Sequence, residues 1–311
     1  MVVTMKKKFA LMLAVSMTVG TVLTGCGSAA KDAAQTAAGA EEQADTDTAQ
    51  EAADAEENTD AATAEETGAD SDTASVDTDL IYAVEAGSAG EAAAQDNGLQ
   101  TNVVTSQADA LMEVAAGTSD AAIIDLLMAG AMIGEGTSYP NLTHTTELTT
   151  EEYGVGCRKG SDLASYINAV FGESFADGTM KETAAVYGVQ EALVEQPATE
   201  FVASVEDSDV AYIQEKGNLI IGITEFEPMD YRDESGEWIG FDADMARLTA
   251  EKLGVEAQFV VIDWDNKIME LESKTIDVVW NGMTLTAETT SAMECTNAYC
   301  NNAQVIVVPA E

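Results

Sequence analysis

Short apolar runs alternate with longer amphipathic stretches from about residue 80 to the end of the chain. Eight of these runs have the length and the polar boundaries typical of buried strands, namely residues 81–84, 102–105, 121–124, 153–157, 219–224, 258–262, 276–280 and 305–308. Helical periodicity lies between them, for instance at residues 106–116, 161–175 and 242–253. Phe241, directly before the last of these stretches, shares one face with Met245 and Leu248. This alternation predicts an α/β fold with mostly parallel sheets.

The sequence before residue 80 follows neither pattern. Residues 28–78 are dominated by Ala, Glu, Asp, Thr and Gln, and the first aromatic residue after them is Tyr82. Such low-complexity acidic sequence buries too little apolar surface to offset its chain entropy, so we expect a disordered tether over residues 26–78. An Ala-rich helical stalk is the alternative, but the like charges of this stretch lack basic partners four residues away.

The N-terminus has the layout of an export signal. Lys6, Lys7 and Lys8 precede an apolar run over residues 9–22, and Leu-Thr-Gly-Cys follows, ending at Cys26. This tetrapeptide resembles a bacterial lipobox, which implies a signal peptide over residues 1–25 and lipidation of Cys26. The apolar run is short and contains Ser, Thr and Gly, so an uncleaved anchor helix is the weaker alternative.

Charge and composition exclude several classes of partner. The chain has 56 acidic and 13 basic residues and a formal net charge of −43. Such a field repels nucleic acid and anionic lipid surfaces, so neither is an expected partner. The only histidine, His144, lies in a Thr-rich segment away from the strand ends, and no Cys/His metal spacing is present. We therefore expect no catalytic set, no metal and no cofactor.

Polar, glycine and aromatic residues gather at the carboxyl ends of the predicted strands, where open α/β sheets bind their ligands. They are Glu85, Gly87 and Ser88 after the first run, Asp125 after the third, Thr224, Glu225 and Phe226 after the fifth, and Asn281, Gly282 and Thr284 after the seventh. Residues 87–90, with Ser88 and Ala89 at their centre, open a helix whose free N–H groups suit a carboxylate. A tight turn without a ligand is the alternative for this loop.

Long segments of the chain resemble a known family. GNLIIGITEFEPMDYRDESGEWIGFDADMARLTAEKLG, IDWDNKIMELESKTIDVVWNGMTLT and NAYCNNAQVIVV are similar to the first half of the polar amino-acid-binding class of bacterial ABC-transporter extracellular solute-binding proteins. YAVEAGSAGE, DAAIID and the stretch from EEYGVGCRKG to AAVYG are similar to its second half. The resemblance implies the type II fold of periplasmic-binding-protein-like domains, in which two lobes with mixed sheets are joined by a two-strand hinge.

The order of these segments is reversed relative to the family, so the chain reads as a circular permutant. The expected solute-binding domain covers residues 79–311. Its parts are a second lobe from residues 79–150 and 304–311, a first lobe from residues 151–189 and 217–303, and a connector over residues 190–216. A truncated tandem duplication is the alternative. The family's helix between the QVIVV-like strand and the AGS-like loop has no clear counterpart, so the second lobe is expected to lack one helix.

The resemblance also implies roles for single residues. Asp125 aligns with the carboxylate that takes the ligand's α-ammonium group, and Phe226 aligns with the aromatic that stacks on the ligand. Trp264 lies where the family contributes a second wall, while Gly282 and Thr284 match donors to the ligand carboxylate. Without the resemblance, the sequence would favour a helix cap for Asp125 and core positions for Phe226 and Trp264. Glu225, Asn281, Ser88 and Ala89 are expected beside these contacts.

One departure from the family affects the expected ligand. The family pattern resembles T-x-T-P-E-R, whose Arg pairs with the ligand carboxylate, whereas TLTAETT has Thr289 at that position. Thr offers neither a charge nor a planar fork of donors. No other basic residue aligns with a known ligand contact, while Glu225, Glu227 and Asp230 crowd one loop. A polar or cationic amino acid, or an amine, is therefore favoured over an acidic one.

The expected function follows from these features together. We expect a lipid-anchored, extracytoplasmic solute-binding protein at the bacterial cell membrane, a monomer that delivers a small amino acid to the permease subunits of an ABC importer. A ligand-sensing lipoprotein without a permease is an alternative. A dehydratase-like enzyme on the same fold is a weaker one, because that enzyme depends on carboxylate-binding Arg residues that this chain lacks.

Three cysteines besides Cys26 remain to be assigned, namely Cys157, Cys295 and Cys300. Outside the cytoplasm a disulfide between Cys295 and Cys300 is possible and would leave one thiol unpaired. All three thiols are free in the alternative case.

Overall fold

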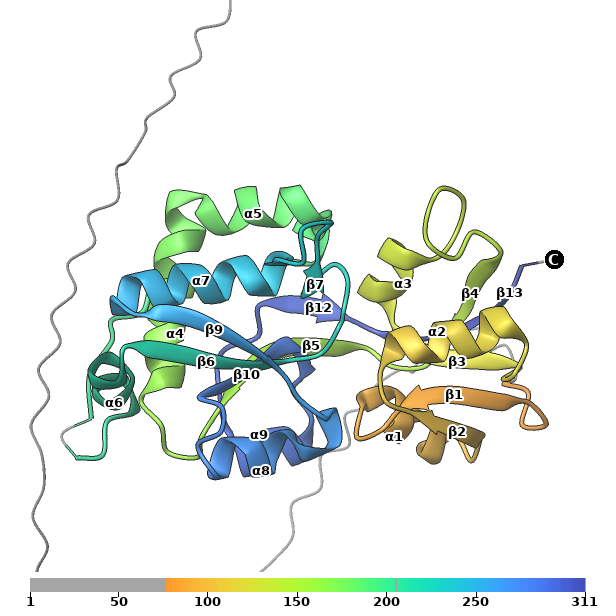
Figure 1. Ribbon diagram of the computed structural model, residues 1–311, viewed down its shortest axis with the longest axis horizontal. Coiled ribbons are helices and arrows are strands. Elements are labelled where there is room, and N and C mark those ends of the chain that lie inside the picture. Colours follow the sequence, from red (N-terminus) through yellow and green to blue (C-terminus); the bar gives the residue numbers. More distant parts are fainter. Residues whose placement is uncertain (1–75, 205, 311) are drawn as a thin grey trace, which may run out of the picture. The chain divides into compact units, whose positions relative to one another are not determined.

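The computed structural model describes residues 76–204 and 206–310 (Figure 1). The predicted signal peptide, Cys26 and nearly all of the predicted tether lie outside these residues. The described part contains a five-stranded sheet, a six-stranded sheet and a two-stranded hairpin. We call the part built on the six-stranded sheet the first lobe and the part built on the five-stranded sheet the second lobe.

The second lobe has the strand order β2-β1-β3-β13-β4. Its strands are β1 (Ile81–Glu85), β2 (Gln100–Val104), β3 (Ala121–Asp125), β4 (Leu142–Glu147) and β13 (Gln304–Pro309). Its helices are α1 (Ala89–Asp96), α2 (Gln107–Ala116) and α3 (Leu126–Met132). Strand β1 runs parallel to β2 and β3, while β13 runs antiparallel to β3 and β4. The helix α2 turns Leu111 and Val114 into the core of this lobe, and all five residues of β3 are buried.

The first lobe has the strand order β11-β5-β10-β6-β9, with β12 also paired to β5. Its strands are β5 (Glu151–Cys157), β6 (Asn218–Ile223), β9 (Glu256–Val261), β10 (Val278–Thr284), β11 (Glu294–Cys295) and β12 (Cys300–Asn302). Its helices are α4 (Leu163–Asp177), α5 (Thr179–Tyr187), α6 (Asp209–Lys216), α7 (Phe241–Leu253), α8 (Lys267–Glu272) and α9 (Ala287–Ala292). Two short 3-10 helices are η1 (Gln190–Ala192) and η2 (Trp264–Asn266).

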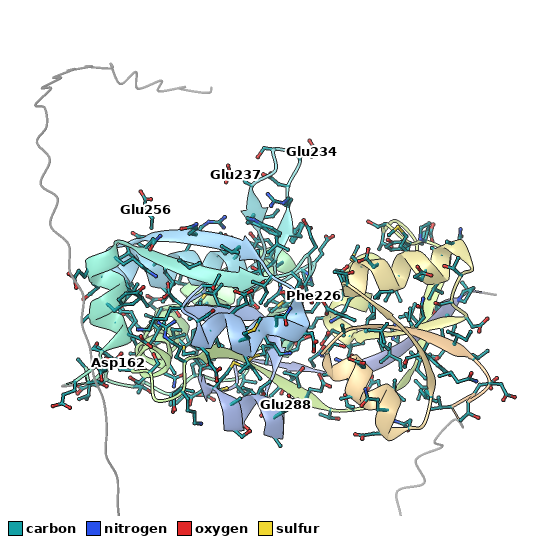
Figure 2. All side chains as sticks on the ribbon, turned by 60° about the horizontal axis from the view of Figure 1, so that its bottom comes forward. Asp162, Phe226, Glu234, Glu237, Glu256 and Glu288 are labelled. Carbon is teal, nitrogen blue, oxygen red and sulfur yellow. The ribbon has the colours of Figure 1, made fainter. Side chains whose placement is uncertain are left out.

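A small hairpin of β7 (Tyr231–Arg232) and β8 (Trp238–Ile239) belongs to the same region of the chain as β6 and α7. Its exposed turn carries Glu234 and Glu237, which project away from the ribbon (Figure 2). The turn is closed by Asp233, whose carboxylate accepts hydrogen bonds from the N–H groups of Ser235 and Glu237. These acidic residues therefore add to the surface charge and not to the pocket described below.

The chain passes between the two sheets twice, from β4 to β5 and from β12 to β13 (Figure 1). The two passages are bonded to each other, because the Leu148 N–H donates to the Gln304 carbonyl at 2.7 Å and the Gln304 N–H donates to the Thr149 hydroxyl at 2.9 Å. This pair of strands is a two-strand hinge. The two-lobe α/β fold with mixed sheets that the sequence predicted is confirmed.

The predicted strands and helices are present, with shifted ends. Strand β10 begins at Val278 and continues to Thr284, whereas residues 276–280 were predicted. Strand β4 was not predicted, because its sequence LTHTTE is polar and mostly exposed at the sheet edge. The exposed His144 lies on this strand. The expectation of mostly parallel sheets was wrong, since β5 and β13 enter from the hinge and run antiparallel to their neighbours.

Across the described ranges, no helix has both the length and the apolar composition required to cross a bilayer. Cys157, Cys295 and Cys300 are all free thiols, so the considered disulfide between Cys295 and Cys300 is not formed here.

Candidate ligand pocket

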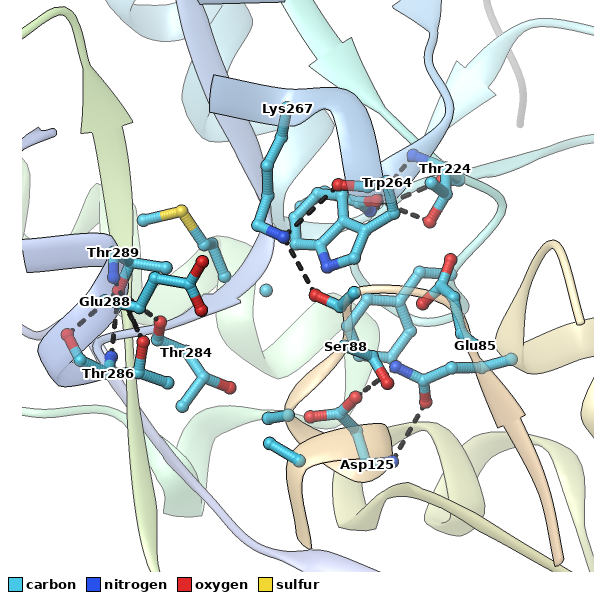
Figure 3. A pocket seen from close by; sticks show the side chains of 18 of the residues that line it. Glu85, Ser88, Asp125, Thr224, Trp264, Lys267, Thr284, Thr286, Glu288 and Thr289 are labelled. Carbon is cyan, nitrogen blue, oxygen red and sulfur yellow. Dashed lines mark hydrogen bonds between the residues drawn. The ribbon is translucent and has the colours of Figure 1, made fainter. Parts of the chain in front are cut away.

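A cavity of about 230 Å³ lies among residues of both lobes (Figure 3). All the ligand-contact residues named from the sequence line it, namely Ser88, Ala89, Asp125, Glu225, Phe226, Trp264, Asn281, Gly282, Thr284 and Thr289. The rest of the lining is Glu85, Gly87, Ala92, Gln107, Thr224, Lys267, Met283, Thr286, Ala287 and Glu288. The strand ends and helix starts that the pattern singled out therefore converge on one site.

The loop before α1 forms one wall. Ser88 caps the helix by accepting a hydrogen bond from the Glu91 N–H at 3.1 Å, and Glu91 Oε2 accepts from the Gly87 N–H at 2.7 Å. The N–H groups of Ala89 and Gly90 begin the helix and have no acceptor in a preceding turn, so they suit an anionic ligand group. Gly87 has φ of +68°, and a Cβ there would lie 2.8 Å from the Asp265 Cα. Only glycine allows this close approach.

Asp125 lies at the end of β3 and is 3% exposed. Its carboxylate accepts hydrogen bonds from the Tyr153 hydroxyl at 2.6 Å and from the side-chain amides of Gln304 at 3.0 Å, Gln107 and Asn302. Burial, followed by the charge of Glu151, raises the pKa of Asp125 to about 7, although these hydrogen bonds act in the opposite direction. The carboxylate is thus held in one position beside the cavity.

Glu85 follows β1 into the same wall and is also 3% exposed. Its Oε1 atom has no hydrogen-bond partner among the described residues. Burial, followed by the charge of Asp125, raises the pKa of Glu85 to about 8, while the ammonium group of Lys267 acts against this rise. A buried carboxyl oxygen without a partner costs free energy, so this atom is suited to meet a donor carried by a ligand.

Among the described residues, Lys267 is the only basic one in the lining, and the sequence reasoning did not name it. It begins α8, is 8% exposed, and its Nζ donates to the Gly87 carbonyl at 2.8 Å and to the Trp264 carbonyl at 3.2 Å. Burial lowers the pKa of Lys267, and the carboxylates of Glu288 and Glu85 oppose this. Its position shortly after the predicted wall residue Trp264 was the one signal in the sequence.

Phe226 and Gly282 define the wall of the first lobe. The Phe226 ring meets the Tyr153 ring edge to face, with centroids 6.3 Å apart. Gly282 has φ of +55°, and a Cβ at that position would lie 2.3 Å from the Phe226 Cε1 atom. The Gly282 N–H, which the resemblance assigns to the ligand carboxylate, donates here to Asp242 Oδ2 at 2.7 Å.

The hydroxyls of Thr284 and Thr289 also have partners inside the protein. Thr284 Oγ1 donates to Glu151 Oε2 at 2.8 Å. Thr289 Oγ1 donates to the Thr284 carbonyl at 3.0 Å and accepts from the Thr286 N–H at 2.9 Å, as part of a capping box at the start of α9. The three groups considered for the ligand carboxylate are therefore all bonded within the protein.

Asn281 ties the ends of β6 and β10 together below the cavity. Its Oδ1 accepts from the Thr224 hydroxyl at 2.7 Å, and its Nδ2 donates to Asp230 Oδ2 at 2.9 Å. Asp230 is fully buried behind the wall and Glu227 is not part of the lining, so of the three acidic residues expected in this loop only Glu225 lines the cavity. Trp264 of η2 also lines the cavity (Figure 3).

The lining contains four carboxyl groups and one ammonium group, the carboxyls being those of Glu85, Asp125, Glu225 and Glu288. Burial raises the pKa of Glu85 to about 8 and that of Asp125 to about 7, so a cation that enters the cavity stabilises the ionised form of these two groups. Glu225 lies 3.5 Å from Arg232. This distribution favours a ligand that carries positive charge. Residues 76–204 and 206–310 contain no cluster of three or more His, Cys, Asp or Glu side chains that could hold a metal ion.

Residues 219–311 match the family of bacterial extracellular solute-binding proteins, family 3. The L-cystine-binding protein TcyJ of Escherichia coli K12 is 35% identical over 77 residues, which cover 24% of this chain and 29% of TcyJ. The arginine-binding extracellular protein ArtP of Bacillus subtilis is 32% identical over 93 residues, which cover 30% of this chain and 36% of ArtP.

Among solved structures, that of an ancestral cyclohexadienyl dehydratase is similar, with 34% identity and a TM-score of 0.27. The match covers 28% of this chain and 37% of that protein. The chain thus spans about a third of the length of the relatives that it matches.

Proposed function

We propose that this protein captures a small amino acid, with a cationic or polar side chain, and delivers it to an ABC importer. The observation that carries the proposal is the acidic cavity in which the buried carboxyls of Glu85 and Asp125 lie together. A charge-assisted hydrogen bond from an ammonium group to a buried carboxylate is among the strongest polar contacts a ligand makes. A ligand ammonium at this position also gives Glu85 Oε1 the partner that it lacks among the described residues.

The remaining walls suit the body of an amino acid. Phe226 and Trp264 provide apolar faces, and the first N–H groups of α1 face the cavity at Ala89. We place the ligand α-ammonium at Asp125, its side chain between the aromatic residues and its carboxylate toward α1. Since TcyJ and ArtP are named for cystine and arginine, amino acids are the ligand class to test first.

We also propose that the domain is a circular permutant. In support, the family segment lies at residues 219–311, after the strands β1–β5, and its last strand β13 pairs between β3 and β4 in the sheet of the second lobe. In this proposal residues 79–150 and 304–311 are the second lobe and residues 151–189 and 217–303 the first. Residues 190–216 then connect the family's usual termini. Lipidation at Cys26 would hold the protein on the outer face of the cell membrane.

Thermal shift of the chain against amino acids and amines tests the proposed ligand class. A ligand that binds only the folded state stabilises the protein by about 2.7 kcal/mol when the ligand concentration is a hundred times Kd. Arginine, lysine, ornithine or glutamine should therefore raise Tm. Glutamate and aspartate should not. A panel in which only amines raise Tm, or in which acidic amino acids do so most, would contradict the proposal.

We propose binding without turnover. A dehydratase of this family needs cationic groups on its substrate's carboxylates, and Lys267 is the single cation among the described residues that line this cavity. In the presence of the protein, cyclohexadienyl acids should decay no faster than they do spontaneously. Protein-dependent formation of the aromatic product would establish an enzyme instead.

A further inference from the structure

An amino acid bound in this cavity needs a partner for its carboxylate, and the family's partner is missing. Thr289 stands where the family pattern has Arg, and its hydroxyl is bonded within the α9 cap. The Gly282 N–H and the Thr284 hydroxyl are bonded to Asp242 and Glu151. A carboxylate buried without a counter-charge or donors would make binding unfavourable.

Lys267 is a buried cation without an anionic hydrogen-bond partner among the described residues. Two carbonyl oxygens, those of Gly87 and Trp264, accept from its Nζ, which also lies 5.0 Å from the centre of the Trp264 ring. An ammonium group has three N–H donors, so one N–H can still donate to an anion. The ion pairs found in the described ranges do not include Lys267. An anion delivered by a ligand would therefore meet a cation that is already desolvated and aimed at the cavity.

The position of this ammonium group matches a carboxylate site. Lys267 reaches from the first lobe to the Gly87 carbonyl, which directly precedes the N-terminus of α1 in the second lobe. Figure 3 shows the side chain between Trp264 and Glu288, with its Nζ bonded toward the wall that carries Ser88. The free N–H groups at the start of α1 and the Lys267 ammonium thus face the same region, as in many anion sites at helix N-termini.

We propose that Lys267 binds the ligand carboxylate in place of the Arg that the family pattern has at Thr289. The inference rests on the proposed function, because only a ligand with a carboxylate requires it. The proposed cation thus lies at the start of α8, after β9, whereas the Arg of the family pattern would lie on α9, after β10. Together with Glu85 and Asp125, which also line the cavity, it makes the cavity selective for zwitterions with an extra positive charge.

Matched ligand pairs test this role. Calorimetry would measure Kd for lysine against 1,5-diaminopentane and for arginine against agmatine, since each amine lacks only the carboxylate. For Lys267→Met we expect the amino acid to bind about 10- to 100-fold more weakly, as for loss of one charge-assisted hydrogen bond. The amines should change less than about threefold, and Lys267→Arg should retain the preference for amino acids.

Two further variants complete the experiment. Thr289→Arg in the Lys267→Met background should restore tighter binding of the amino acid relative to its amine, because it returns the cation to the family's position. Lys252→Met is the matched control, since Lys252 pairs with Glu173 at the surface of the first lobe. It should change no Kd. The Tm of each variant verifies folding, and Lys267→Gln replaces Lys267→Met if the latter is unfolded.

The outcomes separate the two proposals. If wild type binds amino acids but Lys267→Met weakens lysine and 1,5-diaminopentane equally, Lys267 only supports the fold and the inference is overturned while the proposed function stands. Unchanged binding of both ligands by the variant overturns it as well. If wild type binds the amines and no amino acid, both the proposed function and the inference fail.

Discussion

At the scale of single residues, Asp125 belongs both to the buried hydrogen-bond network of the fold and to the candidate ligand site. Its carboxylate accepts four side-chain hydrogen bonds and lies against the cavity. Replacing it removes a charge that a ligand ammonium needs and leaves buried donors without an acceptor. The residue is therefore expected to affect both binding and stability.

We predict that Asp125→Ala weakens binding of the cognate amino acid by about 2–4 kcal/mol, because the partner ammonium is left buried and unpaired. Titration calorimetry measures the change. Asp233→Ala, in the exposed turn of the β7–β8 hairpin, serves as the control and should leave Kd unchanged. Equal affinities for wild type and Asp125→Ala would remove this carboxylate from the site.

Glu85 should make stability depend on pH. Its pKa is about 8 in the folded protein against an ordinary value of 4.5, so the folded state binds more protons between these values. The resulting stability is present below about pH 4.5 and is lost as pH rises through about 8. Glu85→Gln should flatten this decline, measured as Tm from about pH 5 to about pH 9.

Ligand binding should show the opposite dependence on pH. A cation binds the ionised carboxylates, so the affinity of wild type for lysine should increase between about pH 6 and about pH 8, while Glu85→Gln should show a smaller increase. Parallel pH profiles for the two proteins would contradict the role given to Glu85.

At the scale of elements, the end of β10 shows how a glycine shapes the cavity. Gly282 combines a positive φ with a close approach to Phe226, where a Cβ would lie 2.3 Å from the ring. A side chain there must displace the ring that forms one wall.

We predict that Gly282→Ala destabilises the protein by about 2–4 kcal/mol, from overpacking together with strain at positive φ, and that it also weakens binding. Gly254→Ala is the matched control, because Gly254 has φ of +77° and no described atom lies within 4 Å of its Cβ position. Urea denaturation should show a larger loss for Gly282→Ala. Similar losses in both variants would mean that the close approach of Gly282 to Phe226 does not affect stability.

The sequence predicted the elements with a strong pattern and missed those without one. Buried strands such as β3 and β6 carry continuous apolar runs, so their positions were predictable. Strand β4 carries Thr and His on an exposed edge, and β11 and β12 have only two and three residues, so hydrophobicity leaves no trace of them. The antiparallel course of β5 comes from the hinge, which no local pattern encodes.

The candidate site was predictable to a similar extent. The residues that line the cavity were predicted from their positions at strand ends and helix starts, because this topology brings the carboxyl ends of the strands together. The partners of Gly282 and Thr284 were not predictable, since Asp242 and Glu151 reach them only in three dimensions. Lys267 was missed for the same reason, as its contact with Gly87 joins residues 180 positions apart.

At the scale of the whole molecule, a buried ionic network ties residues 190–216 to the first lobe. Arg158 at the end of β5 donates to Asp209 of α6 at 2.9 Å and lies 3.4 Å from Asp277. Lys216, at the end of α6, pairs with the same fully buried Asp277. The helix of the proposed connector is thus part of the packed domain.

We predict that Arg158→Met destabilises the protein by about 3–5 kcal/mol, because it leaves the charge of Asp277 buried with one partner fewer. Glu173→Gln, which removes the partner of Lys252 at the surface, should cost at most about 1 kcal/mol. Chemical denaturation followed by circular dichroism compares the two. A loss below about 1 kcal/mol for Arg158→Met would show that the ion pairs of Arg158 contribute little to the stability of the domain.

The most direct test of the whole account is a crystal structure of the protein grown with the amino acid that raises Tm most. We predict one ligand in the cavity lined by Phe226 and Trp264, with its ammonium within hydrogen-bond distance of Asp125 or Glu85. Its carboxylate should contact Lys267 and the first N–H groups of α1. A cavity that stays without ligand, or an amino acid bound elsewhere on the molecule, would contradict the account.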